Sequence, residues 1–314
     1  MNGLKQFLKR ILDPGTGGGA VFSSQPQSYD VVQTVSVQAL GDASGHLILP
    51  LPVNDENQAT EYQTPSKFFI DETYGNKYEA VAFNLGSGEI FKVEREYRIK
   101  RMPTNQLVVN FNLADYRSNV NLDKRYLVEN RFIKSSLPEV QKIAEDIVQK
   151  HKKLSDALRA INGHVIRTLR YGNPQTGLYS VTEALSGQPV DCGGFDTLFC
   201  SICLALGIPV RIVSGFWLGY EKNGMHAWLE VQLPDGRWLP ADPSVEALRK
   251  AGRIKKSGGL GFVGSDRAVF SHGCDIQLDN QFGYAADILQ VPFVLPKSQQ
   301  VKVGVVSNIQ TVRL

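Results

Sequence analysis

The sequence predicts an α+β protein in which an all-β sandwich domain precedes a mixed domain built around one buried helix. Short strands separated by turn residues follow one another between residues 29 and 134, with no helical periodicity among them. From residue 135 onward, amphipathic helices and a more apolar helix come before several further strands. The 314 residues fit two domains, since one domain takes about 100–200 residues. We therefore divide the chain into residues 1–28, 29–134 and 135–314.

The composition is that of an ordinary globular protein, with 42% hydrophobic and 21% charged residues. Thirty-four basic and 31 acidic residues give a net charge of +3, which predicts no nucleic-acid partner. No apolar run reaches the length of a transmembrane helix. The N-terminus is not typical of a signal peptide, because Lys9 and Arg10 interrupt its apolar stretch. Four cysteines do not indicate a disulfide framework, so we expect a cytoplasmic protein with reduced thiols.

Neither a metal site nor an anion site is predicted from the clusters of reactive or charged residues. Cys200 and Cys203 are three residues apart, but they lie within an apolar helical run, and no other Cys/His cluster has ligand spacing. One basic cluster contains no aromatic residue, and we interpret it as a solvated loop. Its members are Arg249, Lys250, Arg253, Lys255 and Lys256.

The pattern of the first residues predicts a short basic amphipathic helix at residues 4–12. Its apolar side chains fall at i, i+3, i+4, i+7 and i+8. They are Leu4, Phe7, Leu8, Ile11 and Leu12, with lysine and arginine on the other side. Residues 13–19, rich in glycine, end this helix and form a linker. The helix either packs on its own protein or docks on a partner groove or an anionic membrane surface, and the sequence does not decide between these.

Alternation with a period of two predicts the strands of the first domain. Val35, Val37 and Ala39 alternate with polar neighbours, and other strands are expected in the segments that follow. These segments are 46–49, 78–85, 91–99 and 107–109. Turn residues separate them, which favours an antiparallel sandwich of about 100 residues. No residue pattern in this domain indicates chemistry.

Three helices and then several strands are predicted in the second domain. Ser135-Ser136 cap a helix with Pro138 in its first turn, and a second helix starts at Ser155-Asp156. The third helix is the most apolar; Gly207 and Pro209 end it, and we expect it to be central and buried. Strands are expected at 210–213, 225–233, 268–270 and 301–306.

A hairpin brings His226 and Asp242 together. The turn Leu233-Pro234-Asp235-Gly236 joins two strand-like segments, and pairing across it places His226 opposite residues 243–244. Opposed Cβ atoms in an antiparallel pair lie about 4.5–5.5 Å apart. Asp242 therefore reaches His226 with a small adjustment of register. Trp228 shares the face of His226 and either lines the site or belongs to the core.

Cys192 stands at the start of the predicted buried helix. Free N–H groups and the helix macrodipole favour a thiolate there, and a Cys192⁻/His226⁺ pair oriented by Asp242 follows from this. Asp191 acts against it, because a neighbouring carboxylate raises the pKa of a thiol. The Cys192 N–H is one donor for an oxyanion. Other contacts with substrate are expected from Gly193-Gly194 at the helix entrance and from a second donor, for which Gln188, Tyr171 and Tyr179 are candidates.

The segments that contain Cys192, His226 and Asp242, together with the strand entry at Gly207–Arg211, resemble the transglutaminase-like superfamily. Asp191-Cys192 and Gly207-Ile208-Pro209-Val210-Arg211 precede His226-Ala227-Trp228-Leu229-Glu230, and Trp238-Leu239-Pro240-Ala241-Asp242-Pro243-Ser244 follows. The resemblance covers about residues 137–290. It implies a papain-like α+β core, a central helix carrying the cysteine against an antiparallel sheet. It also implies Cys192 as nucleophile, His226 as base and Asp242 as orienting residue. Many prokaryotic members carry an N-terminal β-sandwich, in agreement with residues 29–134.

The activity that we expect is cysteine-dependent amide chemistry through an acyl-enzyme, as in a peptidase or amidohydrolase acting on a protein or peptide. Transfer of the acyl group to an amine, which is transglutaminase activity, shares the first half of this reaction. A scaffold that keeps the fold without catalysis is a further alternative. So is an acyltransferase of the arylamine N-acetyltransferase or peptide N-glycanase type. No cofactor or metal signature accompanies the motif.

Overall fold

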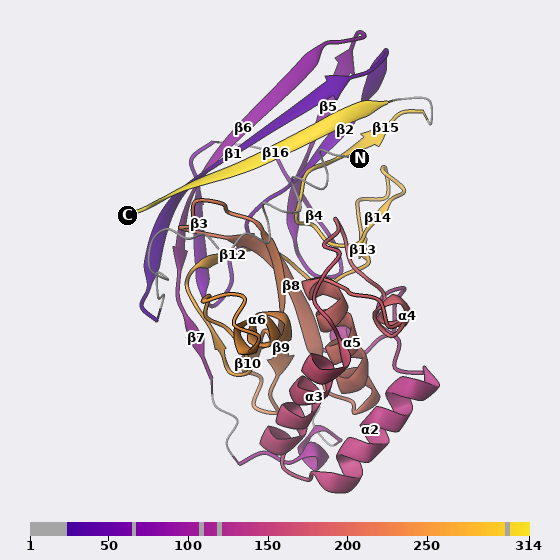
Figure 1. Cartoon of the computed structure of the whole chain (residues 1–314). Coiled ribbons are helices and arrows are strands. Elements are labelled where there is room, and N and C mark those ends of the chain that lie inside the picture. The colour runs from indigo at the N-terminus through magenta and orange to yellow at the C-terminus, as the bar shows by residue number, and fades with distance from the viewer. Residues whose placement is uncertain (1–23, 65–66, 107–109, 118–120, 299–301) are drawn as a thin grey trace.

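A β-sandwich lies at one end of the protein and a group of helices at the other, with a third sheet between them (Figure 1). This computed structural model describes residues 24–64, 67–106, 110–117, 121–298 and 302–314. The helix predicted at 4–12 and the strand predicted at 107–109 lie outside these residues. No described helix is both long and apolar enough to cross a bilayer.

Two antiparallel four-stranded sheets form the sandwich. The first has the order β16-β1-β6-β3 and contains Val303–Arg313, Gln27–Ala39, Ile90–Arg101 and Gln58–Tyr62. The second has the order β15-β2-β5-β4 and contains Phe293–Pro296, Ala43–Pro50, Lys77–Leu85 and Phe69–Ile70. Val35 and Val37 of β1 are buried in one cluster with Leu47 and Leu49 of β2. Alternate residues of each strand thus face the partner sheet, and the predicted β-sandwich is confirmed.

The last two strands of the chain belong to the sandwich. β16 pairs antiparallel with β1 from Tyr29↔Arg313 to Ala39↔Val303, and β15 pairs with β2. The division made from the sequence placed all residues after 134 in the second domain, so its boundary does not describe these strands. Local periodicity identifies a strand but carries no information on a partner at the other end of the chain.

The second part of the chain is built on the sheet β10-β9-β8-β12 and on helix α5 (Cys192–Ala205). The strands are Trp238–Ala241, Met225–Gln232, Val210–Trp217 and Arg267–His272. α5 packs on β8 and β9, and every residue from Gly193 to Cys203 is buried. The predicted central helix is therefore confirmed. Around it lie α2 (Pro138–Lys150), α3 (Leu154–Thr168), α4 (Val181–Ala184) and α6 (Pro243–Lys250).

Short elements complete the described chain, and the helix starts differ slightly from the prediction. The elements are β7 (Thr104–Asn105), η1 (Leu113–Tyr116), η2 (Lys124–Tyr126), β11 (Phe262–Val263), β13 (Ile276–Gln277) and β14 (Ala285–Ala286). The N-cap of α2 is Leu137, without a side-chain cap. The hydroxyl groups of Ser135 and Ser136 instead donate to Glu129, at 2.9 and 3.1 Å. The predicted serine cap is therefore wrong.

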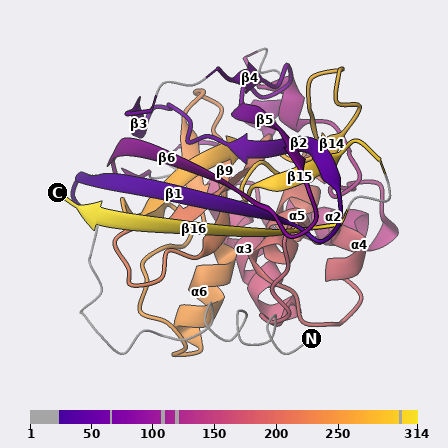
Figure 2. The ribbon, with the colours of Figure 1, turned by 90° about the horizontal axis from the view of Figure 1, so that it is seen from above.

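One end of the first sandwich sheet covers the core sheet (Figure 2). Tyr29 of β1 and Tyr97 of β6 are buried in a single cluster with Phe216 of β8 and Phe270 of β12. The rings of Tyr97 and Phe270 meet edge to face, with centroids 6.5 Å apart. This shared apolar layer joins the sandwich to the sheet that carries the candidate site.

Candidate functional site

Cys192 is the first residue of α5, where a side-chain cap fixes the chain. Asp191 is the N-cap, and its Oδ1 accepts a hydrogen bond from the Gly193 N–H at 3.0 Å. Its Oδ2 accepts from the Gln175 N–H at 2.9 Å. These bonds satisfy an N–H group that the helix start leaves without an intrahelical partner, and they tie the preceding loop to it. Cys192 keeps partial exposure to solvent.

The glycines after Cys192 serve packing in this structure. A Cβ at Gly193 would lie 2.8 Å from the Leu178 side chain, and one at Gly194 would lie 2.5 Å from Val190. The Gly193 N–H already donates to Asp191. Gly193 is buried, so the predicted contact of this residue with substrate is not supported.

The thiol of Cys192 is held in its neutral form. Burial raises its pKa well above the ordinary value, and the carboxylates of Asp191 and Asp196 raise it further. A hydrogen bond from the Ala227 N–H lowers the pKa but does not offset these effects. The thiolate expected from the helix N-terminus is therefore wrong for this structure, because burial of the thiol, reinforced by two acidic neighbours, outweighs the macrodipole. Asp191 itself has a pKa raised to about 6, chiefly by burial.

His226 and Asp242 are in direct contact. The hairpin pairs Trp238 with Gln232 and continues to Ala241, after which Asp242 caps α6. His226 Nε2 lies 2.8 Å from Asp242 Oδ2, and both side chains are buried. The register inferred from the turn thus places these two residues as expected. Ala227, the residue after His226 in β9, makes a backbone hydrogen bond to Cys192.

Arg267 is a member of this group that the sequence analysis missed. Its Nη1 lies 2.6 Å from Asp242 Oδ2, and its Nη2 donates to the Ser257 carbonyl at 2.5 Å. The side chain is fully buried. Burial alone would raise the pKa of Asp242, but the charges of His226 and Arg267 outweigh it and hold that pKa below its usual range. The only signal in the sequence is an arginine that directly precedes an apolar strand.

Two tryptophans enclose the imidazole. The rings of Trp217 and His226 stack with centroids 4.5 Å apart, and Trp228 lies at 5.9 Å on a nearly parallel plane. Trp228 has no exposed surface, so it belongs to the core and does not line an open site. Burial lowers the pKa of His226 below its ordinary value, and Arg267 lowers it further, although Asp242 acts in the opposite direction. The neutral imidazole is the favoured form near pH 7.

Of the three residues expected as a second oxyanion donor, only Tyr171 lies beside Cys192. Gln188 is exposed, and the Tyr179 hydroxyl donates to the Asn173 carbonyl at 2.6 Å. Tyr171 forms a bridge with Val190, two residues before Cys192. Its pKa is raised well above the ordinary value, first by burial and then by Cys192 and Asp191.

Asp196, one helical turn after Cys192, is a second residue that the sequence analysis missed. It has no exposed surface, and neither carboxyl oxygen has a hydrogen-bond partner among the described residues. Burial raises its pKa well above the ordinary value, and Asp242 and Asp191 raise it further. Within the described residues, no group of three or more His, Cys, Asp or Glu side chains has the arrangement of a metal site.

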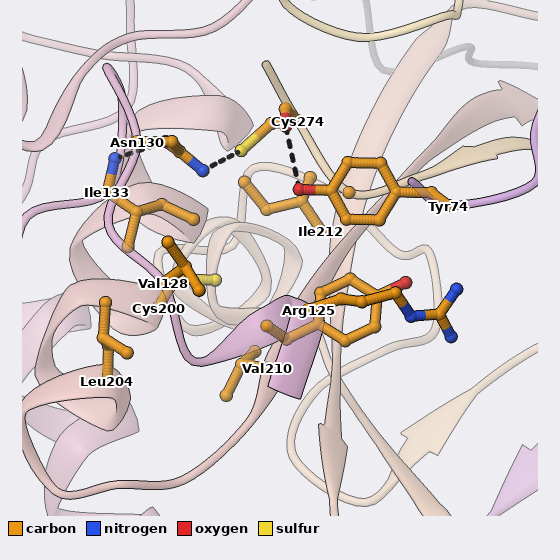
Figure 3. A pocket seen from close by; sticks show the side chains of 12 residues that line it. Tyr74, Arg125, Val128, Asn130, Ile133, Cys200, Leu204, Val210, Ile212 and Cys274 are labelled. Atoms are coloured by element: carbon orange, nitrogen blue, oxygen red, sulfur yellow. Dashed lines mark hydrogen bonds between the residues drawn. The ribbon is translucent and has the colours of Figure 1, made fainter. Parts of the chain in front are cut away.

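A separate small pocket lies further along α5 (Figure 3). Cys200 and Cys274 line it, and the Tyr74 hydroxyl donates to the Cys274 carbonyl at 3.2 Å. Its volume of about 20 Å³ accommodates about one water molecule. Neither Cys192 nor His226 contributes to its lining. This pocket is too small to accept a peptide.

Comparisons with known proteins agree with this arrangement. Residues 141–243 match the model of the transglutaminase-like superfamily. A candidate cysteine protease from Cytophaga hutchinsonii has a TM-score of 0.56 at 16% identity, covering 90% of this chain and 91% of that chain. The periplasmic domain of TgpA from Pseudomonas aeruginosa, bound to ethylmercury, has a TM-score of 0.40 at 15% identity, with coverages of 77% and 96%. The curated proteins contain no match. At these identities the first likeness establishes the fold alone.

Proposed function

We propose that this chain, which carries a transglutaminase-like core at residues 141–243, is an enzyme that breaks an amide bond through an acyl-enzyme on Cys192. The observation that carries the proposal is the buried hydrogen bond of 2.8 Å between His226 and Asp242. His226 lies in strand β9, and the N–H of the next residue in that strand, Ala227, bonds to the Cys192 thiol. The proposal takes Cys192 as the nucleophile, His226 as the base and Asp242 as the group that orients the base.

The assignment of the two imidazole nitrogens follows from this contact. Nε2 is engaged by Asp242, which leaves Nδ1 to accept the thiol proton. The Cys192 sulfur attacks the carbonyl carbon and forms a C–S bond. The proton on His226 then passes to the leaving amine as the C–N bond breaks. Water attacks the resulting thioester, the acid leaves, and the proton returns to the sulfur.

The timing of the proton transfer follows from the pKa directions. Burial and the two neighbouring acids raise the pKa of Cys192, and burial lowers that of His226. The resting site is therefore a neutral thiol beside a neutral imidazole. His226 takes the proton as the sulfur attacks, in general-base catalysis, and no ion pair forms beforehand.

Hydrolysis is the form of the reaction that we propose, with a peptide or protein as substrate. An amine that reached the thioester before water would give transglutaminase-type transfer instead. Incubation with a peptide library and a fluorescent primary amine separates the two outcomes. New peptide termini are expected, whereas amine incorporation without cleavage would establish transfer. The variant Cys192→Ala controls for both products.

A scaffold without catalysis is the competing proposal, and thiol labelling tests it. A peptide that carries a thiol-reactive group is expected to label Cys192 faster than the buried Cys274. The labelling rate should fall at least about tenfold in His226→Ala, because the base is removed. Equal labelling of both cysteines, unchanged by His226→Ala, would favour the scaffold.

The cytoplasmic location is part of the same proposal. All four cysteines are free in the structure, which is compatible with a reducing compartment. Cell fractionation with a specific antibody tests the location directly, and recovery in another fraction would contradict it.

A further inference from the structure

The segment after α6 places two cations beside the candidate site. The Arg253 guanidinium lies 5.9 Å from the ring centre of Tyr171, and its Nη1 donates to the Tyr171 carbonyl at 3.3 Å. Lys256 Nζ lies 4.0 Å from the ring centre of Trp217 and 4.3 Å from that of Tyr220. The interpretation of this basic cluster as a solvated loop is therefore wrong for Lys256, although it holds for the exposed Lys255.

The two cations lie beside different members of the site. The rings of Trp217 and His226 stack with centroids 4.5 Å apart, so the indole ring of Trp217 contacts both Lys256 and the imidazole. Lys256 is close enough to lower the pKa of His226. Tyr171, on which Arg253 packs, forms a β-bridge with Val190. Cys192 is one of the groups that influence the pKa of Tyr171. Each of the two groups of the candidate site thus has a cation beside its aromatic neighbour.

Lys256 forms no ion pair with any of the residues that the structure describes. Its amine makes no hydrogen bond or ion pair with any described residue, and it rests on aromatic rings alone. Asp266, the nearest candidate, already accepts a hydrogen bond from Tyr220 at 2.6 Å and contacts Arg267 at 3.4 Å. Burial lowers the pKa of Lys256 to about 7, Asp266 and Asp242 partly offset this, and Arg267 reinforces it. An ammonium group in this position is stabilised when an anion binds.

We propose that Lys256, assisted by Arg253, forms a subsite for a substrate carboxylate, so that the enzyme acts on acidic peptides. This rests on the proposed function, because it takes Cys192 as the point of attack. A carboxylate gives Lys256 a charge-assisted hydrogen bond that a neutral amide gives only weakly. The acidic group of the substrate is therefore attracted toward the cations while its amide bond reaches Cys192.

Alkylation of Cys192 by two small reagents tests the subsite. Iodoacetate carries the carboxylate, and iodoacetamide is its neutral counterpart of similar size. We expect Lys256→Gln to lower the ratio of the iodoacetate rate to the iodoacetamide rate about fivefold at about pH 6, where the wild-type amine is protonated. Arg253→Gln should lower it by a smaller factor. Lys256→Arg should keep it within about twofold of the wild type, since the charge stays.

Lys255→Gln is the matched control, because it removes the same charge one residue earlier from an exposed position. A ratio unchanged by Lys256→Gln, or lowered equally by Lys255→Gln, overturns the carboxylate subsite. A peptide with glutamate should also protect Cys192 from iodoacetamide better than the same peptide with glutamine, and equal protection argues against the subsite. If iodoacetamide does not label Cys192 at all, the proposed function fails first and the subsite with it. Normal labelling with an unchanged ratio overturns the subsite alone.

Discussion

Arg267 and His226 bond to the same oxygen of Asp242, at 2.6 and 2.8 Å. The arginine keeps its charge at every pH of interest, so Asp242 stays ionised whether or not the imidazole carries a proton. Asp242 therefore holds the His226 ring through a hydrogen bond, and the accepting carboxylate keeps its negative charge over this pH range. The positive charge of Arg267 also opposes protonation of His226.

Replacing Arg267 with methionine tests this arrangement. Asp242 would lose its fixed counter-charge while remaining buried, so we expect the free energy of unfolding to fall by about 3–5 kcal/mol. In the folded fraction, the pKa of His226 should rise, because one nearby positive charge is gone. Urea denaturation measures the first effect, and the NMR titration of the imidazole measures the second.

Arg237→Gln is the control for that experiment. Arg237 pairs with Asp235 at 2.7 Å, but both side chains are largely exposed. Such pairs contribute about 0–1 kcal/mol, so this variant should unfold almost as the wild type does. An equal decrease in the free energy of unfolding in the two variants would show that the buried contact with Asp242 stabilises the protein no more than an exposed ion pair does.

The alkylation rate of Cys192 should rise with pH through a step below pH 6.5. Burial lowers the pKa of His226, and the neutral ring is the form that can take the thiol proton. The raised pKa of the thiol keeps direct ionisation out of this range. Iodoacetamide kinetics between about pH 4 and 9 measure the profile. A single step above pH 9 that persists in His226→Ala would show that no base assists.

Asp191→Asn should increase the alkylation rate at pH 7. Asp191 is the strongest electrostatic cause of the raised thiol pKa, and asparagine removes its charge while keeping an oxygen for the cap. The iodoacetamide rate of the variant at neutral pH is the measurement. A rate equal to or lower than that of the wild type would mean that burial alone determines the pKa of Cys192.

The same variant should change how stability depends on pH. The pKa of Asp191 rises from 3.8 to about 6 on folding, so its contribution to stability is complete below about pH 4 and is lost as pH rises through 6. The loss is up to about 3 kcal/mol. The variant Asp191→Asn does not lose this stability as the pH rises, because asparagine does not ionise. The difference in unfolding free energy between variant and wild type should therefore shift in favour of the variant between pH 4 and 7, as urea denaturation at both values would measure.

Gly215→Ala should disrupt the core sheet. Gly215 lies in β8 between His226 of β9 and Val269 of β12, and an added Cβ would collide with the Ala268 carbonyl oxygen. A backbone group cannot move aside as a side chain does, so we expect a loss of about 3 kcal/mol or more. Thermal unfolding measures it. Gly304→Ala is the control, since no atom lies within 4 Å of its Cβ position.

Ile309→Ala should destabilise both parts of the protein together. Ile309 of β16 is 6% exposed and lies in the cluster that joins β1 to Phe216 and Phe270 of the core sheet. We expect a cost of about 2–5 kcal/mol and a single unfolding transition. Near- and far-UV circular dichroism together measure this. Val306→Ala, at a residue 70% exposed on the same strand, should cost less than about 0.5 kcal/mol. Two separate transitions would contradict the shared layer.

Local patterns in the sequence determined several strands, the central helix and one contact between residues sixteen positions apart. The period of two predicted β1, β2, β5 and β6, and the apolar run after Cys192 predicted the buried helix α5. The contact between His226 and Asp242 was also within reach of sequence reasoning, because a tight hairpin turn fixes the register of the strands on both sides of it. Each of these depends on neighbours that are close in the chain.

Only the tertiary structure decided the surroundings of those residues. Arg267 reaches Asp242 from β12, and β16 pairs with β1 across almost the whole chain; no local pattern identifies the partner in either contact. The pKa of Cys192 likewise depends on burial and on two acids whose exposure no pattern reveals. Lys255 and Lys256 are alike in the sequence, yet only Lys256 rests on Trp217. Charge and solvation depend on distances in space, and packing alone sets those distances.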